Sequence, residues 1–325
     1  MSLEIRFLDA TAPLEPGQTV LDALDKAGVT IPSSCRAGAC QSCLLRLTDG
    51  AVPSSAQAGI RESLRLTGHF LSCICKPTQS IACEPASVVA CRTLVSIREI
   101  QAIGPDVALV RFERPSAFAF TAGQFVTLKR EDGLARSYSL ASSAEHQSHF
   151  DIHVRRVGNG RMSGWFHDQA RPRDQLWMEG PKGDCMYYPG QPDEPLTLVG
   201  TGTGIAPLYA IAVDAVRKGH TGPIAIYHGG VSPDRLYFVN ECESLASANA
   251  NVRYLPCVIR GEVRGEVRVG DLKQFVISEL SETKKGRVYL CGDPSLVNTL
   301  KKLVFLAGVS LSRIHADPFI GTEAG

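Results

Sequence analysis

The sequence predicts a multidomain chain that combines α+β and α/β folds. Its 325 residues are enough for two or three domains. Seven of its eleven cysteines lie within the first 91 residues, so the chemistry of that part differs from the rest. The spacing of apolar runs then changes near residue 93 and again near residue 191. We therefore expect an α+β domain over 1–90, an antiparallel β-barrel over 93–190 and a parallel α/β domain over 191–325.

The overall composition is that of an ordinary globular protein, with 44% hydrophobic and 21% charged residues. The net charge of +1 and the lack of basic runs interleaved with aromatics give no reason to expect a nucleic-acid partner. No apolar run approaches the roughly 18 residues that cross a membrane. We expect a cytoplasmic monomer without a membrane partner, whose cysteines are reduced or bound to metal.

The first chemical signal is the spacing of Cys35, Cys40 and Cys43, which are separated by four and then two residues. This is the spacing of plant-type [2Fe–2S] centres, which add a distant fourth cysteine. Small residues at 37–39 let the loop close around a cluster and aim backbone N–H groups at the sulfurs. Cys73 and Cys75 compete for the fourth position. A zinc site made from the same thiolates is the alternative, although zinc sites usually use two C-x2-C pairs.

The surroundings of this loop predict a small α+β domain. Ile5, Phe7 and Leu8 indicate a first strand, and Leu44, Leu45 and Leu47 indicate another after the loop. Between them, residues 19–28 have the apolar spacing of a short helix, with Thr19 as its N-cap.

From residue 93 onward, short apolar runs separated by turn residues predict the antiparallel barrel. We expect strands over 94–100, 107–112, 125–128 and 150–154, after a linker over 84–92.

Two segments of this barrel carry candidate binding residues. In the first, an arginine can hold a phosphate, a tyrosine can pack on a flavin ring, and hydroxyls can bond its edges. The second precedes a helix expected over 164–168, and a helix N-terminus suits a pyrophosphate. Taken singly, the segments could be a surface strand and a helix cap. Their residues are Arg136, Ser137, Tyr138 and Ser139, then Gly160, Arg161, Met162 and Ser163.

The third domain opens with a buried strand over 196–199, a glycine-rich turn over 200–207 and a helix reaching residue 218. Such a turn lets the backbone approach a phosphate, although its spacing is not GxGxxG. Further strands are expected over 223–227, 252–258 and 287–290, with helices over 236–246, 271–280 and 295–307. This alternation predicts a Rossmann-like parallel sheet with a site at the carboxyl ends of its strands.

Cys291, Gly292 and Asp293 follow one of those strands and precede Pro294. A small polarisable thiol at this point could lie beside a nicotinamide ring. The alternative is a buried cysteine with a purely structural role.

Taken together and in order, these motifs resemble the ferredoxin–NAD(P)⁺ reductase superfamily. More narrowly, the chain is similar to reductase components of bacterial multicomponent oxygenases, of the ring-hydroxylating type, that carry an N-terminal plant-type ferredoxin. The resemblance covers essentially the whole chain. The matching segments are SCRAGACQSC with LSC, RSYS, GRMS, MEGPKGD, GTGTGIAP, CGDP and a terminal aromatic residue.

The resemblance implies a β-grasp ferredoxin domain over 1–90, FAD in the barrel and NAD(P)H in the last domain. The segment around LSC resembles the closing segment of plant-type ferredoxins, which selects Cys73 as the fourth ligand; Cys75, Cys83 and Cys91 are then small apolar residues. Catalytic candidates at the flavin are Cys291, Ser139 and Phe319. Of these, Phe319 would cover one face of the flavin ring. Other contacts implied by the family come from His153, Val154 and Arg155 along the ring and from Gly202, Thr203 and Gly204 at the nicotinamide.

Three departures from the family pattern stand out. Lys182 replaces the usual aromatic residue in Gly-Pro-x-Gly, and Gln41 replaces a common glycine in the iron loop. In addition, six residues follow Phe319 in this sequence.

We expect NADH as the nucleotide. The loop over 229–235 would meet the adenosine ribose, where NADPH-using relatives place serine and basic residues for the 2′-phosphate. Here Asp234 stands in that loop, while Ser232 and Arg235 keep NADPH open as an alternative.

The expected electron path follows from what each carrier can do. NADH delivers two electrons as a hydride, a [2Fe–2S] cluster accepts one at a time, and a flavin can do both. We therefore expect electrons to pass from NADH to FAD, to the cluster, and to a terminal oxygenase or an intermediate ferredoxin. A di-iron monooxygenase, a P450 or a deoxysugar dehydratase are alternative acceptors. A carrier or sensor without NADH turnover, and a zinc-containing flavin reductase, are the other classes.

Overall fold

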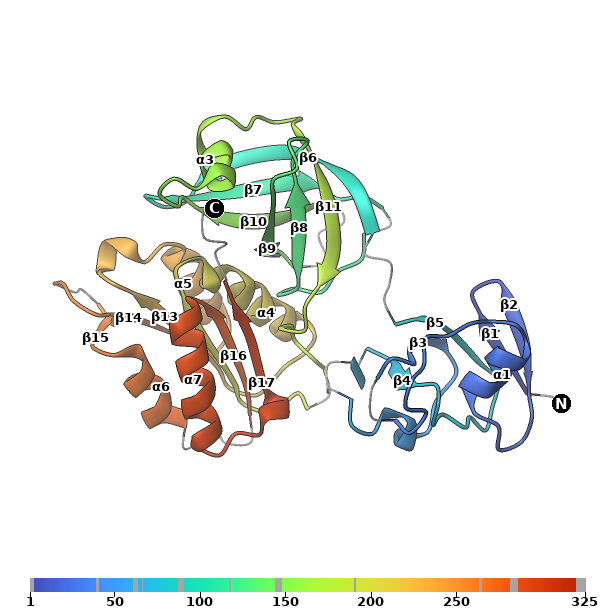
Figure 1. Ribbon diagram of the computed structural model, residues 1–325. Coiled ribbons are helices and arrows are strands. Elements are labelled where there is room, and N and C mark those ends of the chain that lie inside the picture. Colours follow the sequence, from blue (N-terminus) through green and yellow to red (C-terminus); the bar gives the residue numbers. More distant parts are fainter. Residues whose placement is uncertain are drawn as a thin grey trace. The chain divides into compact units, whose positions relative to one another are not determined.

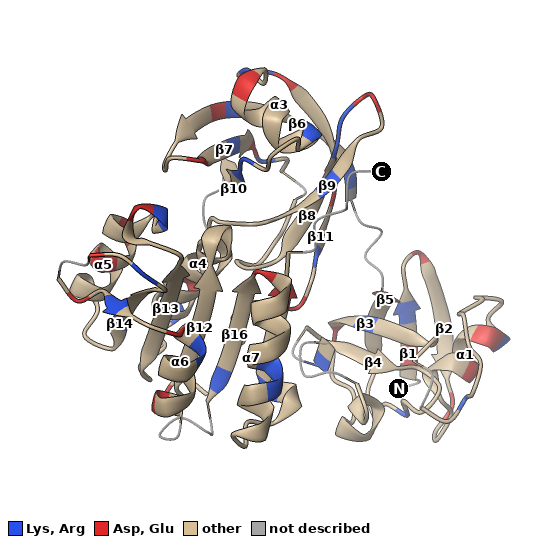
Figure 2. Cartoon of the chain, turned by 60° about the vertical axis from the view of Figure 1, so that its left-hand side comes forward, with Lys and Arg blue, Asp and Glu red and all other residues tan. Residues whose placement is uncertain are grey.

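The structure is a computed structural model, which describes residues 3–38, 41–60, 64–65, 67–86, 91–116, 118–143, 148–189, 191–262, 265–280 and 286–319. The chain forms two compact units, Met1–Ala90 and Cys91–Gly325 (Figure 1). Acidic and basic residues are interspersed along the described parts of each unit (Figure 2). Within these ranges no helix is both long enough and apolar enough to cross a lipid bilayer.

The first unit is a five-stranded mixed sheet with helix α1 packed on it. The strand order is β2-β1-β5-β3-β4, in which β1 runs parallel to β5 and every other pair is antiparallel. This is the β-grasp arrangement that we expected. Its elements are β1 (Leu3–Phe7), β2 (Ala10–Leu14), α1 (Val20–Lys26), β3 (Leu44–Asp49), η1 (Ser54–Gln57), β4 (His69–Leu71) and β5 (Ile81–Pro85).

Helix α1 begins as predicted, with Thr19 as its N-cap. The Thr19 hydroxyl accepts a hydrogen bond from the backbone N–H of Asp22 at 3.1 Å, which satisfies one of the free donors of the first turn. Val20, Leu21 and Leu24 then face the sheet and are buried. The expected first strand was wrong at its last residue, because Leu8 turns with φ at 53° and is 66% exposed.

The second unit begins with a six-stranded antiparallel barrel of order β10-β7-β6-β11-β8-β9. A bridge between Leu140 and Ile152 links the chain after β9 to β10 and closes the barrel. Stacked Phe112 and Phe150, 5.2 Å apart, lie in its core. The elements are β6 (Cys91–Ala102), β7 (Val107–Glu113), β8 (Phe125–Lys129), β9 (Ala135–Ser139), β10 (His149–Arg155), α3 (Arg161–Asp168) and β11 (Gln175–Lys182).

The rest of the second unit is a parallel sheet of order β15-β14-β13-β12-β16-β17. Helices cover both faces, α4 and α5 over one apolar cluster and α6 and α7 over another (Figure 1). Its strands are β12 (Leu196–Thr201), β13 (Ile224–Gly230), β14 (Val252–Val258), β15 (Arg268–Val269), β16 (Arg287–Gly292) and β17 (Ile314–Pro318). The helices are α4 (Ile205–Arg217), α5 (Val239–Ala248), α6 (Leu272–Leu280) and α7 (Pro294–Leu306), with short turns η2 (Gly202–Gly204), η3 (Pro233–Arg235) and η4 (Leu311–Arg313).

Two boundaries differ from the expected ones for clear reasons. The helix expected from residue 236 begins only at Val239, because Phe238 adopts a left-handed conformation with φ at 62°. The helix expected from residue 164 begins at Arg161, so the glycine–serine motif is its first turn.

In the parallel sheet, β12 and β16 are neighbours, and Gly200 pairs with Cys291. The carboxyl ends of these two strands therefore lie side by side.

Candidate functional site

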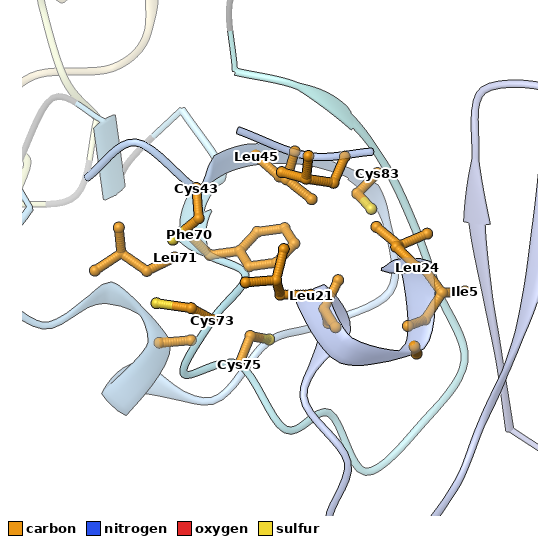
Figure 3. Packing of buried hydrophobic residues seen from close by; sticks show 14 of the residues in the cluster. Ile5, Leu21, Leu24, Cys43, Leu45, Phe70, Leu71, Cys73, Cys75 and Cys83 are labelled. Carbon is orange, nitrogen blue, oxygen red and sulfur yellow. The ribbon is translucent and has the colours of Figure 1, made fainter. Parts of the chain in front are cut away.

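Three of the four predicted iron ligands lie together in the first unit, and the fourth, Cys40, falls outside the described residues. The Cys73 thiol hydrogen-bonds to Cys43, and Cys35 is close enough to act on it electrostatically. Ser72 holds this geometry, because its backbone N–H and its hydroxyl both donate to the carbonyl of Cys43, at 3.1 and 2.8 Å. Figure 3 shows Cys43 and Cys73 near one another, with Cys83 at the opposite side of the cluster.

Backbone amides already point at the sulfur atoms of this site. The N–H of Ala37 donates to Sγ of Cys35 at 3.4 Å, and Gly38 makes a backbone hydrogen bond to Cys73. Burial nevertheless raises the pKa of Cys73 to about 11, and the contact with Cys43 adds to the shift. Amide donors stabilise thiolates and tune the metal centres they hold.

Arg36 fastens the iron loop to helix α1. Its guanidinium forms ion pairs with Asp22 at 3.0 Å and with Asp25 at 2.6 Å. The loop turns through left-handed conformations at Arg36, Gly38 and Gln41, with φ at 49°, 78° and 59°. The loop therefore reverses direction repeatedly around the point where Cys35 and Cys73 approach.

Cys75 and Cys83 have a different environment. Both are buried in the apolar core of the first unit, at 0% and 2% exposure. Burial is the main cause that raises the pKa of each thiol to about 12. The thiol that acts electrostatically on Cys75 is Cys83, whereas Cys73 lies against Cys43.

Strand β9 presents the first barrel motif. The Ser137 hydroxyl lies 3.2 Å from that of Thr127 on β8, and Arg136 is half-buried and donates to the carbonyl of Ala135 at 2.7 Å. Tyr138 meets the ring of Phe166 edge-on at 5.7 Å, and burial raises the pKa of its hydroxyl. Successive side chains of the motif therefore point to opposite faces of β9, and Tyr138 packs at the margin of the barrel core.

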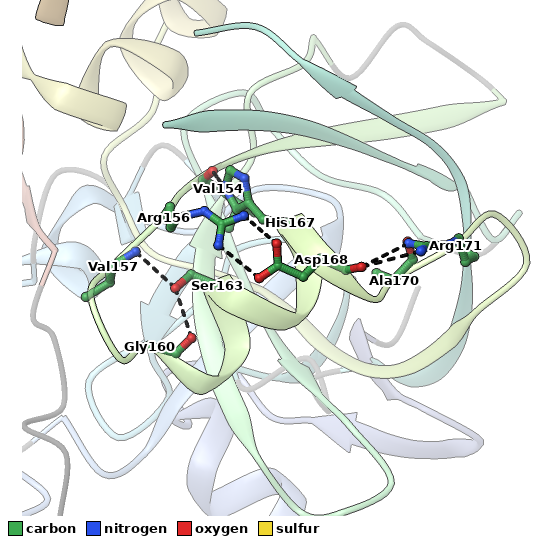
Figure 4. Close-up of polar contacts among 9 residues, drawn as sticks. All are labelled: Val154, Arg156, Val157, Gly160, Ser163, His167, Asp168, Ala170 and Arg171. Carbon is green, nitrogen blue, oxygen red and sulfur yellow. Dashed lines mark hydrogen bonds and ion pairs between the residues drawn. The ribbon is translucent and has the colours of Figure 1, made fainter. Parts of the chain in front are cut away.

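The second barrel motif forms a tight turn at the start of α3 (Figure 4). The Ser163 hydroxyl accepts from the N–H of Val157 at 3.1 Å and donates to the carbonyl of Gly160 at 3.3 Å. The Met162 side chain is buried in the barrel core. The turn lines a surface depression of about 540 Å³, and the N–H groups of a first helical turn favour an anion.

The carboxyl ends of β12 and β16 form the third part of the site. A Cβ on Gly204 would lie 2.3 Å from the carbonyl oxygen of Cys291, so only glycine allows the two loops to approach this closely. Gly292 has φ at 119° and packs against the backbone of Thr201. Asp293 caps α7 by accepting from the N–H of Leu296 at 2.9 Å.

The three catalytic candidates come together around Asp317 on β17. Ser139 donates to its carboxylate at 2.9 Å, and Cys291 is its neighbour across the parallel pair β16–β17. Burial raises the pKa of Asp317, an effect that the hydrogen bond from Ser139 reduces. Phe319 follows two residues later, half-buried, with its backbone N–H bonded to the carbonyl of Gly292 at 2.8 Å. The barrel and the parallel sheet therefore meet at these residues.

A second junction lies at the loop after β13. Asp234 is exposed and lies 3.6 Å from Arg235, whose guanidinium also reaches Asp106 of the barrel at 3.2 Å. Two residues further on, the Tyr237 hydroxyl hydrogen-bonds to His153 on β10 at 3.0 Å. The side chain of His153 is therefore engaged with the loop of the parallel sheet.

Three protein families match successive parts of this chain. Residues 7–78 match the model of a 2Fe-2S iron-sulfur cluster binding domain. Residues 94–187 match an oxidoreductase FAD-binding domain, and residues 198–302 an oxidoreductase NAD-binding domain. The chain is 30% identical to the reductase subunit of an aromatic O-demethylase from an Amycolatopsis species, over 94% of this chain and 95% of that one.

The chain belongs to the ferredoxin–NAD(P)⁺ reductase superfamily. It is 29% identical to reductase component 1 of the terephthalate 1,2-dioxygenase of a Comamonas species, covering 99% of this chain and 98% of the relative. The crystal structure of a cytochrome P450 reductase from Amycolatopsis matches with a TM-score of 0.66 and 28% identity, covering 98% of this chain and 99% of that one. The predicted family and fold class are therefore confirmed.

This reductase uses a [2Fe–2S] cluster, FAD and NAD(H) as its cofactors. The residues present fit each group. Amides aimed at Sγ of Cys35 and Cys73 suit thiolate ligands, and the turn at Gly160 suits a pyrophosphate. At Gly202, φ is 54°, and an added Cβ would lie 3.2 Å from the guanidinium of Arg155, so glycine keeps open the space that a nucleotide would enter.

Two residues that contact the candidate site from outside it escaped sequence reasoning. The thiol of Cys185, just after β11, lies 3.6 Å from that of Cys291. Asp106 lies between Arg235 and Arg155, at 3.2 and 3.7 Å. Cys185 stands three residues after Lys182, where the chain leaves the barrel, and a cysteine at that exit was the available signal. Asp106 carried no signal, because its partners are remote in sequence.

Proposed function

We propose that this reductase oxidises NADH and supplies electrons to the terminal component of a multicomponent oxygenase, directly or through an intermediate ferredoxin. Its relatives support this reading. They include reductase components of a terephthalate 1,2-dioxygenase from Comamonas and of a naphthalene 1,2-dioxygenase system from Pseudomonas putida, 29% and 28% identical. Residues 1–90, 93–190 and 191–325 would hold the cluster, FAD and the nucleotide, respectively.

One observation carries the proposal. The contacts of Ser139, Asp317 and Cys291 bring β9, the strand proposed to bind the flavin, to the end of β16, where the nicotinamide is expected. When bound, FAD takes up a hydride from NADH and releases its electrons singly to a [2Fe–2S] cluster. Within the second unit, the chain's own contribution would be to hold FAD and NADH in a fixed orientation. Ser139 and Asp317 fix β9 against β17, and the backbone bond between Phe319 and Gly292 keeps the aromatic residue beside the nicotinamide loop.

The remaining residues have binding roles in this proposal. Arg136 and the turn from Gly160 to Ser163 would hold the FAD phosphates, as guanidinium groups and helix N-termini do. The backbone of 153–155 would lie along the flavin ring, because the His153 side chain is turned to Tyr237. Asp234 would accept from the adenosine ribose hydroxyls. Cys35, Cys40, Cys43 and Cys73 would bind iron.

An anaerobic titration with NADH, followed by visible absorption and then by low-temperature EPR, tests the proposal. We expect the flavin absorption to bleach and the EPR signal of a reduced plant-type [2Fe–2S] cluster to appear. Bleaching without that signal would contradict the cluster assignment and favour a zinc-containing flavin reductase. A protein with full FAD content that NADH does not bleach would instead be a carrier or sensor.

The same electron chain could serve a different acceptor, which is the second candidate function. A phenol hydroxylase component from Acinetobacter pittii and a CDP-deoxysugar dehydrase reductase from Yersinia pestis are each 24% identical to this chain. Purified Rieske oxygenase, di-iron hydroxylase, P450 and dehydratase components, each offered to the NADH-reduced protein, would separate these acceptors by the rate of their reduction.

We further propose that the reductase acts as a monomer in the cytoplasm. The absence of a long apolar run in the sequence agrees with this proposal. Light scattering after gel filtration should then give a mass near 35.0 kDa, and a mass twice as large would contradict the proposal.

A further inference from the structure

The carboxylate of Asp106 pairs with Arg155 of the barrel and with Arg235 in the loop after β13 of the parallel sheet. Asp106 lies in the turn between β6 and β7, and its backbone carbonyl accepts from the N–H of Arg156 at 2.7 Å. One of its carboxylate oxygens lies 3.2 Å from the guanidinium of Arg235 and 3.7 Å from that of Arg155. Its side chain is only 28% exposed, whereas both arginines are more than half exposed.

The two arginines stand at different points along the expected nucleotide path. Arg155 lies against Gly202, in the glycine-rich turn after β12. Arg235 follows β13, next to Asp234, at the point where dinucleotide folds read the ribose. In such folds an acidic residue at this place bonds the 2′-hydroxyl of NAD, and a nearby arginine accommodates the 2′-phosphate of NADP.

This loop carries the acidic Asp234 next to the basic Arg235. The ion pairs of Arg235 therefore decide whether its guanidinium can bind a 2′-phosphate. Arg235 is paired with two carboxylates, Asp106 at 3.2 Å and Asp234 at 3.6 Å. A 2′-phosphate would have to compete with both for the guanidinium, and it would meet the negative charge of Asp234. The carboxylate of Asp234 is itself on the exposed side of the loop.

The turn that carries Asp106 is well fixed against the same loop. A Cβ on Gly104 would lie 3.0 Å from Cβ of Tyr237, so the turn and the loop are in close contact. Tyr237 is held in turn by its hydrogen bond to His153 at 3.0 Å. The carboxylate of Asp106 is thus presented to Arg235 from a rigid part of the barrel rather than from a free side chain.

We infer that Asp106 is a specificity-determining residue, which favours NADH by holding Arg235 away from a 2′-phosphate. This inference rests on the proposed function. It places part of the nucleotide choice outside the nucleotide-binding domain, on the turn of the barrel that contacts it. Another basic residue, Arg260, follows β14, and its backbone N–H bonds to the carbonyl of Val231 in the same loop at 3.1 Å.

The test is the ratio of kcat/KM for NADPH to that for NADH, measured by dye reduction with the full-length holoprotein. For Asp106→Asn we expect kcat/KM with NADPH to rise roughly tenfold, as for one released arginine–phosphate contact. The value with NADH should stay within about twofold of wild type, because the ribose partner Asp234 is unchanged. In Asp106→Asn/Arg235→Gln the gain with NADPH should disappear.

A matched control removes the same charge elsewhere on the barrel. Glu99 on β6 pairs with Arg111 at 3.2 Å, away from both nucleotide loops, so Glu99→Gln should leave the NADPH to NADH ratio unchanged. An unchanged ratio in Asp106→Asn would overturn the inference. So would a gain with NADPH that persists without Arg235 and is lost in Asp106→Asn/Arg260→Gln, because the phosphate partner would then be Arg260.

These outcomes are distinct from a failure of the proposed function. Turnover of NADH by the unmodified protein tests the proposed function, and the change in ratio tests the role of Asp106. Retained FAD content and an unchanged melting temperature in Asp106→Asn would show that a shift in ratio does not reflect misfolding. A wild-type protein that already prefers NADPH would contradict the inference directly.

Discussion

The thiols of Cys185 and Cys291 lie 3.6 Å apart, one on the segment leaving the barrel and the other at the end of β16. Both side chains are buried, at 3% and 0% exposure. A Cβ on Gly123 would lie 2.2 Å from the carbonyl of Cys185, so the segment is also wedged against the barrel. The cysteine expected beside the nicotinamide is therefore backed by a second thiol that ties the two domains of this unit together.

This contact controls the reactivity of Cys291. The hydrogen bond with Cys185, followed by burial, holds the pKa of Cys291 well above its usual range, so the thiol is neutral at ordinary pH. Replacing Cys185 with alanine removes the first of these causes and should lower that pKa. We expect iodoacetamide to label Cys291 several-fold faster in Cys185→Ala than in wild type, because a lower pKa increases the thiolate population.

Cys242→Ala provides the control, because Cys242 is equally buried but lies on α5. Its removal should leave the labelling of Cys291 unchanged, as followed by mass spectrometry of the native protein. Equal labelling rates in wild type and Cys185→Ala would show that burial alone protects Cys291.

Cys73 and Cys75 offer a direct test of the fourth iron ligand. Both are buried, but only Cys73 lies against Cys43. We expect Cys73→Ala to lose the iron and acid-labile sulfide, and Cys75→Ala to retain both. The second variant should lose only about 1 kcal/mol of unfolding free energy, as for a small volume removed from a core. Iron retained in Cys73→Ala and lost in Cys75→Ala would reverse the assignment.

Much of this fold could be predicted because local patterns and global order agree. The strand Val252–Val258 is buried at every position except Arg253, as expected in a parallel sheet covered on both faces, and its predicted bounds agree with the structure. Strand β11 was missed although Leu176 and Met178 alternate with exposed neighbours, because Gly180 and Pro181 within it are residues typical of turns. Strand β17 was missed because a short edge strand has little pattern of its own.

The site divides in the same way. The glycine-rich turn that contains Gly204 was predicted from its place between a strand and a helix, and the roles of Gly204 and Gly292 at the nucleotide come from the family resemblance. The contacts between remote side chains were not predicted, because nothing in a sequence pairs Ser139 with Asp317 or Asp106 with Arg235. The left-handed turn at Phe238 was also hidden, because such a conformation is rare for a bulky residue and is imposed by the packing around it.

Gly204 and Gly164 form a matched pair for testing the close approach of the loops that follow β12 and β16. A Cβ on Gly204 would overlap the carbonyl of Cys291, whereas a Cβ on Gly164 in α3 meets nothing within 4 Å. We expect Gly204→Ala to lose about 1–3 kcal/mol of unfolding free energy and most NADH turnover, because the ends of β12 and β16 must separate. Gly164→Ala should gain about 0.5–1 kcal/mol, since alanine suits a helix interior.

Urea denaturation and steady-state dye reduction of the two variants measure these effects. Full turnover in Gly204→Ala would mean that the close contact of these loops is not needed for hydride transfer. A loss of stability in Gly164→Ala would instead point to an unseen constraint in α3.

The buried histidines should make the second unit less stable in mild acid. Burial lowers the pKa of His153 to about 4 and that of His228 to about 3. An unfolded histidine titrates near its ordinary pKa of about 6.5. The unfolded chain therefore binds more protons below about pH 6.5, and the native state loses stability as the pH falls toward 4. Each such histidine contributes up to about 1.4 kcal/mol per pH unit in this window.

His153→Gln removes one of these protons, so its unfolding free energy should fall less steeply than that of wild type between about pH 6.5 and about pH 4.5. Tyr237→Phe is the control, because it deletes the hydrogen bond to His153 but keeps the buried imidazole. It should lose about 1 kcal/mol at every pH and keep a wild-type slope. Urea denaturation across this range measures both effects. If the two variants show the same slope as wild type, His153 is able to bind a proton in the folded protein, and burial does not govern its titration.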